Sequence, residues 1–195
     1  GPRPILKITN TRGKRITFER LTFRGGFNDN TNEGGAVTIS KADALFRQSA
    51  FVDNRVTGIT GGGAIKVLEG SQATFVDCSL RNNSARNRGG AIAVRAGAVV
   101  TMLRGEMVGN RTNLPGHDPR SIGGAIWALD GTLRITGTRF EGNEAGLVGG
   151  AIYAIGSWDQ GAALLISGAT LLPNQAPPGP CSPTGETTGR GALPD

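Results

Sequence analysis

The sequence contains a single histidine, which stands next to an acid at His117-Asp118. Histidine titrates near neutral pH and a carboxylate can orient its ring, so such a pair is one form of a catalytic or metal-binding site. A metal site commonly needs three or four ligands, however, and the chain has no second histidine. We therefore expect no catalytic residue, no metal ion and no cofactor.

The pair lies in a polar segment from Arg111 to Ile122, which also contains two prolines and Arg120. Two interpretations stay open: a contact loop stiffened by its prolines, or a neutral insertion. Further arginines lie near this and comparable segments, and with Arg120 they form a candidate basic strip: Arg55, Arg86, Arg88 and Arg111. Exposed arginines are also common on ordinary solvated surfaces.

Three amphipathic rings form a second candidate surface: Trp127, Tyr153 and Trp158. Exposed aromatic rings with polar neighbours stack on sugars or anchor protein partners. Rings on adjacent strands also stack on one another and stabilise a sheet. Both interpretations stay open.

A repeat must position these residues. The tetrapeptide Gly-Gly-Ala-aliphatic occurs five times, beginning at Gly34, Gly62, Gly89, Gly123 and Gly149. The spacings are 28, 27, 34 and 26 residues, the period of a solenoid coil. Each glycine pair predicts a turn with φ above zero, where a Cβ would strike the neighbouring coil.

A second motif, apolar-x-x-Asn, runs out of phase with the glycines and ends at Asn54, Asn83, Asn110, Asn143 and Asn174. Upstream, Gly26 takes the place of the asparagine and marks a sixth coil. The copy at Leu103 and Met107 is one residue short in this frame. Asparagines stacked in a column can satisfy one another's amide groups, so we predict a structural asparagine ladder.

Apolar and polar residues alternate on both sides of each turn, which predicts strands with one buried face. Ile65 and Val67, and their equivalents in later coils, are expected to face the core. The intervening residues are expected to face solvent: Lys66, Ala93, Trp127 and Tyr153. With 32 glycines and few aromatic residues, the composition also favours an all-β chain.

Length variation is concentrated on one edge of each coil. The first four coils keep 20 or 21 residues from glycine pair to asparagine, and the last has 25, with extra residues around Trp158. From Gly26 or an asparagine to the next glycine pair, the spacing runs from 6 to 13 residues. Variable loops on a rigid solenoid are where binding usually occurs.

The net charge of +6 and the pI of 10.1 arise from bases spread along the chain, so nucleic-acid binding has only charge in its favour. No apolar run approaches the roughly 18 residues of a membrane span. Two cysteines make no disulfide framework. Cys78 falls in an inward column and is expected to be a buried thiol; whether it pairs with Cys181 in the proline-rich tail stays open.

The Gly-Gly-Ala-aliphatic and Phe-x-x-Asn motifs, in register over about Ile5 to Asn174, resemble the polymorphic outer-membrane-protein repeat family and, more broadly, bacterial right-handed parallel β-helix proteins. The resemblance implies a secreted or cell-surface protein, often an adhesin-like segment, and no particular activity. We expect a right-handed parallel β-helix of about six coils over residues 1–174. Residues 175–195 are expected to form a tail, cap or linker.

Parallel β-helices also include polysaccharide lyases and hydrolases, which cluster carboxylates on one outer face. In this frame the acids do not stack, since Asp77 faces Gln48 and Gly105. We expect a non-enzymatic structural or adhesive module that binds a protein or a glycan outside the cell. A subunit of a larger assembly is the alternative, and a polysaccharide-active enzyme is the less favoured one.

Overall fold

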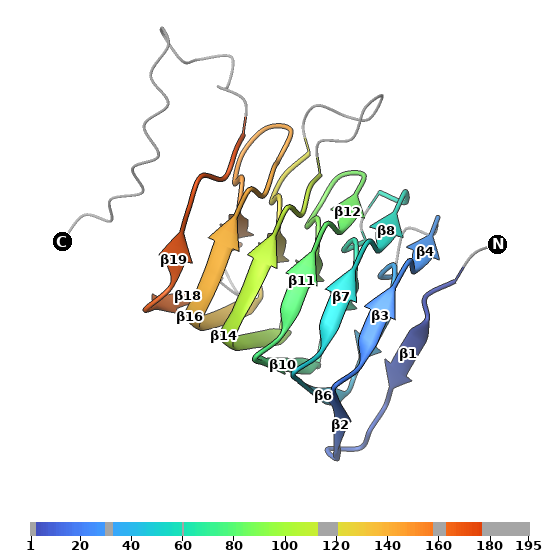
Figure 1. Ribbon diagram of the computed structural model, residues 1–195. Helices are drawn as coiled ribbons and strands as arrows, with labels where there is room; N and C mark the ends of the chain where they lie inside the picture. Colours follow the sequence, from blue (N-terminus) through green and yellow to red (C-terminus); the bar gives the residue numbers. More distant parts are fainter. Residues whose placement is uncertain (1–2, 30–32, 60, 113–120, 158–162, 177–195) are drawn as a thin grey trace, which may run out of the picture.

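The computed structural model describes residues 3–29, 33–59, 61–112, 121–157 and 163–176. It is a rod of stacked coils, with the first coil at one end and the last at the other (Figure 1). The described residues form strands, and none of them belongs to a helix that could span a membrane. All strand pairs are parallel and join equivalent residues of successive coils. The predicted all-β, parallel β-helix is confirmed.

Three sheets run along the rod. Sheet A is formed by β1 (Leu6–Thr9), β5 (Val37–Ser40), β9 (Ile65–Val67), β13 (Ile92–Val94), β15 (Ile126–Leu129) and β17 (Ile152–Ile155). The first strands of sheet B are β2 (Arg15–Glu19), β6 (Asp43–Arg47), β10 (Gln72–Val76), β14 (Val99–Val108), β16 (Thr132–Glu141) and β18 (Ala163–Ser167). Its remaining strands are β3 (Thr22–Arg24), β7 (Ala50–Val52), β11 (Ser79–Arg81) and β19 (Thr170–Leu171). Sheet C contains β4 (Phe27–Asn28), β8 (Arg55–Val56) and β12 (Ser84–Ala85).

Residues with positive φ form a column at the bend inside sheet B. These residues are Arg20, Gln48, Asp77, Arg104, Gly137 and Gly168, with φ between 46° and 61°. Left-handed backbone is costly for most side chains, so its recurrence shows that the bend is imposed by the stacking of the coils. The bend lies within β14 and β16, so these two long strands join the two halves of sheet B.

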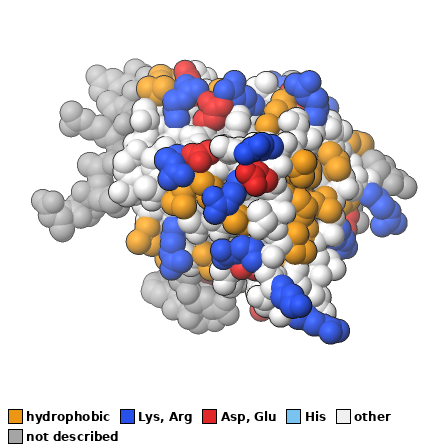
Figure 2. All heavy atoms as spheres, turned by 60° about the horizontal axis from the view of Figure 1, so that its bottom comes forward, with side chains coloured by type: hydrophobic (Ala, Val, Ile, Leu, Met, Phe, Trp, Pro, Cys, Tyr) orange, Lys and Arg blue, Asp and Glu red, His pale blue; other side chains and the backbone are white. Residues whose placement is uncertain are grey.

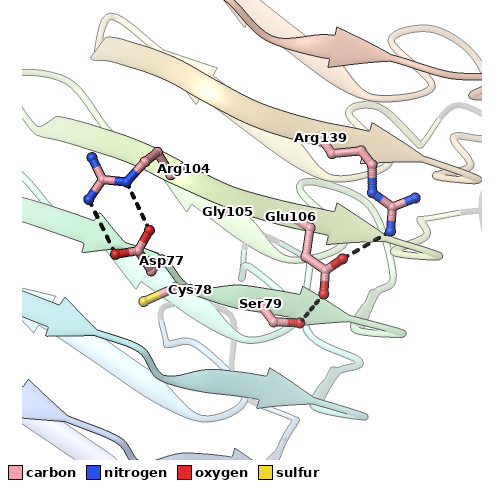
Figure 3. Close-up of a pocket in the computed structure, with 7 residues that line it drawn as sticks. All are labelled: Asp77, Cys78, Ser79, Arg104, Gly105, Glu106 and Arg139. Atoms are coloured by element: carbon pink, nitrogen blue, oxygen red, sulfur yellow. Dashed lines mark hydrogen bonds and ion pairs between the residues drawn. The ribbon is translucent and has the colours of Figure 1, made fainter.

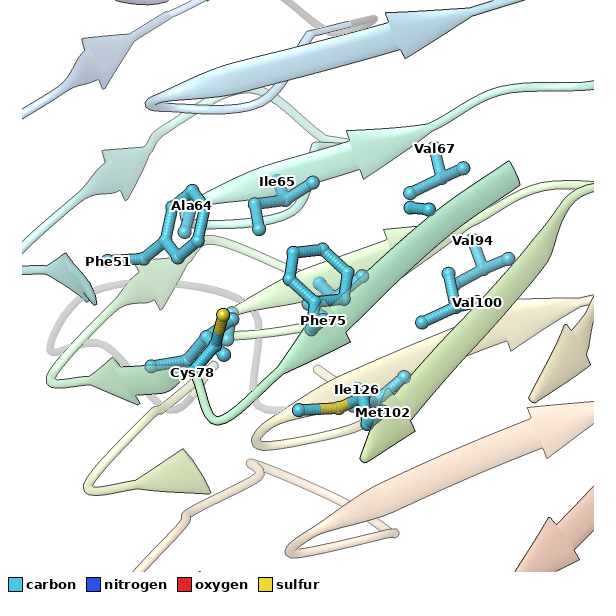
Figure 4. Packing of buried hydrophobic residues seen from close by; sticks show 14 of the residues in the cluster. Phe51, Ala64, Ile65, Val67, Phe75, Cys78, Val94, Val100, Met102 and Ile126 are labelled. Atoms are coloured by element: carbon cyan, nitrogen blue, oxygen red, sulfur yellow. The ribbon is translucent and has the colours of Figure 1, made fainter. Parts of the chain in front are cut away.

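The core is a set of apolar columns between the sheets (Figure 4). Phe18, Phe46 and Phe75 stack in one column at centroid distances of 5.0 and 5.2 Å, and Phe23 stacks on Phe51 at 4.8 Å. The two columns meet edge to face, the arrangement that aromatic quadrupoles favour. As predicted, Ile65, Val67 and their equivalents belong to this core.

The fourth coil keeps the full frame, contrary to our prediction that it is one residue short. Met102, rather than Leu103, pairs with Phe75 and points into the core. Leu103 pairs with Val76 and is only half-buried. Methionine fills the phenylalanine column because its flexible thioether adapts to the gap.

Candidate functional site

The asparagines form a continuous hydrogen-bonded ladder at one corner of the rod. Asn54 donates from its backbone N and its Nδ2 to Oδ1 of Asn83, at 3.0 and 2.9 Å. Its Nδ2 also donates to the carbonyl of Phe23 in the preceding coil, at 3.0 Å. The same pattern continues through Asn110, Asn143 and Asn174. Asn54, Asn83, Asn110 and Asn143 are fully buried, and water cannot replace these bonds.

The glycine pairs lie at the same corner and close each coil on itself. A Cβ on the second glycine would meet the carbonyl oxygen of the equivalent glycine one coil on, at 1.9 Å for Gly63 and 2.0 Å for Gly90. The same Cβ would also meet the backbone of the residue after the asparagine in its own coil: Ser84 for Gly63 and Arg111 for Gly90. The backbone approach therefore requires glycine, as the motif predicts.

The φ prediction for the first glycine of each pair is correct in part. Gly89, Gly123 and Gly149 have φ of 61°, 68° and 69°, whereas Gly34 and Gly62 do not lie in the positive region. At Gly34 and Gly62 the limit is space, because a Cβ would lie 2.3 and 2.0 Å from a carbonyl oxygen.

We call the contact between the second glycine of a pair and the residue after the asparagine the closed corner. The loops of the variable edge therefore begin and end at this corner. Each coil leaves the corner after its asparagine and returns to it at the following glycine pair. The residues that flank the longest loop are held by main-chain bonds: Arg111 N to the Asn83 carbonyl at 2.9 Å, and Ile122 N to the Asn87 carbonyl at 2.9 Å.

The arginines of the candidate basic strip do not share one environment in the structure: some are exposed, and one is packed on an aromatic ring. Arg55, in β8 of sheet C, and Arg111, in an isolated bridge beyond β12, lie in one column; Ser84 pairs with both, and both are exposed. Arg86 is exposed as well. Arg88 is half-buried and lies over the ring of Trp127 at 4.8 Å, in cation–π geometry. Arg120, His117 and Asp118 fall outside the described residues.

Trp127 is buried, contrary to our prediction that it faces solvent. Its side chain points away from the core, but only 2% of the residue is exposed, and Arg95, from the same preceding coil as Arg88, also lies over the ring at 5.7 Å. Tyr153 is half-buried, and Trp158 falls outside the described residues. The ring of Trp127 therefore stabilises the sheet, and its surface is not free for a sugar or a protein.

Lys66 and Ala93 are also buried, although both were predicted to face solvent. The first glycine of the preceding coil lies against each residue: a Cβ on Gly34 would lie 2.8 Å from the Lys66 nitrogen, and a Cβ on Gly62 would lie 2.5 Å from the Ala93 nitrogen. Burial lowers the pKa of Lys66 to about 8, and the positive charges of Arg95 and Arg88 add to the effect. The alternation of inward and outward side chains along the strand was predicted correctly. It does not indicate which outward side chains are covered by other parts of the chain.

Charged pairs cover the outer face of sheet B. The alignment of the coils on their asparagines did not predict these pairs. Figure 2 shows basic and acidic side chains interleaved on this face. Arg104 pairs with Asp77 at 3.0 Å, which replaces the expected contact of Asp77 with Gly105 because Met102 sets the register. Glu106 accepts from Arg139 at 2.9 Å and from Ser79 at 2.9 Å (Figure 3). Glu106 also pairs with Arg81. Partial burial raises the pKa of Glu106, but these bonds outweigh it and leave the pKa below its usual value.

A shallow hollow of about 310 Å³ lies between these pairs, over Gly105 (Figure 3). Its acids and bases neutralise one another, so it has no unpaired carboxylate for acid–base chemistry. Cys78 lies beneath it with its Sγ directed to the carbonyls of Phe46 and Val76, both at 3.4 Å, and burial raises the pKa of the thiol. The buried thiol was predicted; Cys181 falls outside the described residues. Within the described ranges, no cluster of three His, Cys, Asp or Glu side chains could hold a metal ion.

Comparison with known proteins gives one match. Residues 137–155 match the sequence model of the Chlamydia polymorphic membrane protein repeat. The matched segment contains Asn143 and the pair Gly149-Gly150, and it therefore spans the loop from the asparagine of one coil to the glycine pair of the next. No curated protein and no solved structure matches the chain. The matched repeat and the stacked coils together show a parallel β-helix repeat protein similar to the polymorphic membrane proteins.

Proposed function

We propose that the chain is a non-enzymatic structural or adhesive module, secreted or displayed at the cell surface, that binds a protein or a glycan through its loop edge. The observation that carries the proposal is the closed corner, where the second glycine of each pair meets the residue after the asparagine. This contact leaves loop length and loop sequence free to vary. The similarity to a membrane-protein repeat family supports the surface location.

A loop replacement tests the proposal. Residues 113–120 are replaced by a short Gly-Ser turn, while Thr112 and Ser121 are kept because their backbone N and Oγ, respectively, bond to Glu144 and Gly146 in the next coil. The probes are a glycan array and a panel of purified extracellular-matrix proteins. The control is Arg134→Ser, an exposed position on the outer face of sheet B. We expect the loop variant to lose binding and the control to keep it; equal binding by both would contradict the proposal.

A second candidate, a subunit of a larger assembly, has an observation of its own. The last coil exposes apolar side chains at positions that are buried in every described coil between the two ends. This end of the rod is treated in the next section.

A further inference from the structure

The last coil leaves the core open. Leu164, Ile166 and Leu171 are 46%, 41% and 57% exposed, although they occupy inward columns. Their register partners one coil earlier are 0%, 1% and 0% exposed: Leu133, Ile135 and Phe140. We call this end the C-terminal face. An apolar end of this kind needs a cover in a solenoid.

The backbone at this face is open too. In the described part of the chain, β17 pairs only with β15, and β18 and β19 pair only with β16. Each strand therefore presents one row of N–H and C=O groups that another parallel strand can take up. A fitting cover must supply parallel strands as well as apolar side chains.

The chain's own C-terminal segment has the wrong composition for this role. Residues 177–195 contain five prolines, which lack the N–H that a ladder requires. Leu193 is their only large aliphatic residue. This segment cannot repeat the apolar columns of a coil.

The first coil has the matching composition and geometry. Among the described residues, its strands β1, β2 and β3 each pair on one side, with β5, β6 and β7. Its inward columns hold Leu6, Ile16, Phe18 and Phe23, and Ile16 is 39% exposed. These are the same columns that end in Ile152, Leu164, Ile166 and Leu171 at the other end of the rod.

We propose that the C-terminal face binds the first coil of a second copy of this chain, head to tail. Stacking β1 on β17, β2 on β18 and β3 on β19 keeps every strand parallel and continues each apolar column. After Glu144 the described residues carry no charged side chain, so the basic first coil meets no opposing positive charge. The proposal rests on, and sharpens, the second candidate function and is independent of the loop edge.

Two features set the form of the assembly. The contact joins different surfaces of the two copies, so it leaves one free end on each side and permits further addition. The asparagine ladder is interrupted at the junction, because Gly26 takes the asparagine position in the first coil and offers no Oδ1 to Asn174. The junction is therefore weaker than the contact between coils within one chain, and the assembly is reversible.

Sedimentation velocity of the full chain over a hundredfold range of concentration tests the proposal. Leu164→Glu blocks the C-terminal face and Ile16→Glu blocks the first coil. The matched control is Leu165→Glu, on the same strand but facing outward over Arg134. We expect the wild type and the control to gain mass with concentration, and each blocked variant alone to stay monomeric, since an unpaired charge buried in such a contact weakens it by about a thousandfold or more. Circular dichroism confirms that the variants are folded.

Mixing the two blocked variants gives the decisive result. Head-to-tail contact predicts that they form a dimer and nothing larger, because each variant keeps the one surface that the other lacks. A symmetric contact between two C-terminal faces would reverse every strand across the junction, and Ile16→Glu alone would then still dimerise, which overturns the proposal. A wild type that stays monomeric also overturns it. If a chain ending at Ala176 then gains mass, residues 177–195 are the cover instead.

Discussion

Each interior asparagine uses its whole amide. Asn83 accepts two bonds from Asn54 at Oδ1 and donates from Nδ2 to Asn110 and to the Phe51 carbonyl. Both donors and both acceptor sites are filled, so the residue joins three successive coils. Loss of this side chain leaves buried donors of Asn54 without a partner.

Asn83→Ala is therefore expected to lower the free energy of unfolding by about 2–4 kcal/mol, since each buried unsatisfied group costs about 1–3 kcal/mol. Asn174→Ala is the matched comparison, because Asn174 is half-buried and water can replace its bonds. We expect it to cost clearly less. Urea unfolding followed by circular dichroism measures both, and equal losses would argue against the ladder.

The buried side chain of Lys66 predicts that the free energy of unfolding depends on pH. Its pKa in the folded chain is about 8, below the ordinary value of 10.5, so the unfolded chain binds more protons between these two pH values. Stability should rise from pH 8 to pH 10.5, by about 3 kcal/mol. Glu33 opposes the shift, and Arg95 and Arg88 support it. Below pH 8 the full cost of the buried charge remains.

Lys66→Met isolates this effect. The variant should be as stable as the wild type or more stable at pH 7, and the difference should shrink as the pH approaches 10.5. Unfolding midpoints of both proteins at several pH values measure the difference. A difference that stays constant from pH 7 to pH 10.5 would contradict the buried, charged lysine.

At the scale of the element, the turn at the glycine pair should tolerate no side chain. Gly63→Ala places a Cβ 1.9 Å from the Gly90 carbonyl oxygen, and neither backbone is free to move. We expect a loss of roughly 3 kcal/mol, the upper range for overpacking. Gly70→Ala is the control, because it has a positive φ but its Cβ has no heavy atom closer than 3.9 Å. It should cost about 1–2 kcal/mol from strain alone, and a thermal melt of each variant separates the two.

The sequence predicted the elements well where two motifs agreed in register. The columns through Asn54 and Ile65 follow directly from the repeat. The predicted alignment of this coil was wrong by one residue: it placed Leu103 in the core in place of Met102. Leucine is the more typical core residue, and no neighbouring motif fixed the register there. With the frame shifted, the ion pairs of Asp77 and Glu106 could not be predicted.

At the scale of the whole molecule, the sequence did not predict that other parts of the chain cover the outer face of sheet A. A repeat with period 2 in its strands predicts which side chains leave the core, but not what lies above them. Gly34 lies against the backbone of Lys66, and Arg88 and Arg95 lie over the ring of Trp127, so both side chains are buried. The prediction that Trp127 faces solvent was therefore wrong, while the variable loop edge stays a prediction.

The rod and its loops should be energetically separate, because the corner closes through Gly90, Arg111 and the ladder without residues 113–120. The most direct test is the urea midpoint of the chain in which these eight residues are replaced by a short Gly-Ser turn. We expect a stability within about 0.5 kcal/mol of the wild type, as for changes away from packed features. A loss of several kcal/mol would show that the loop holds the coil together, and would contradict a closed corner that carries interchangeable loops.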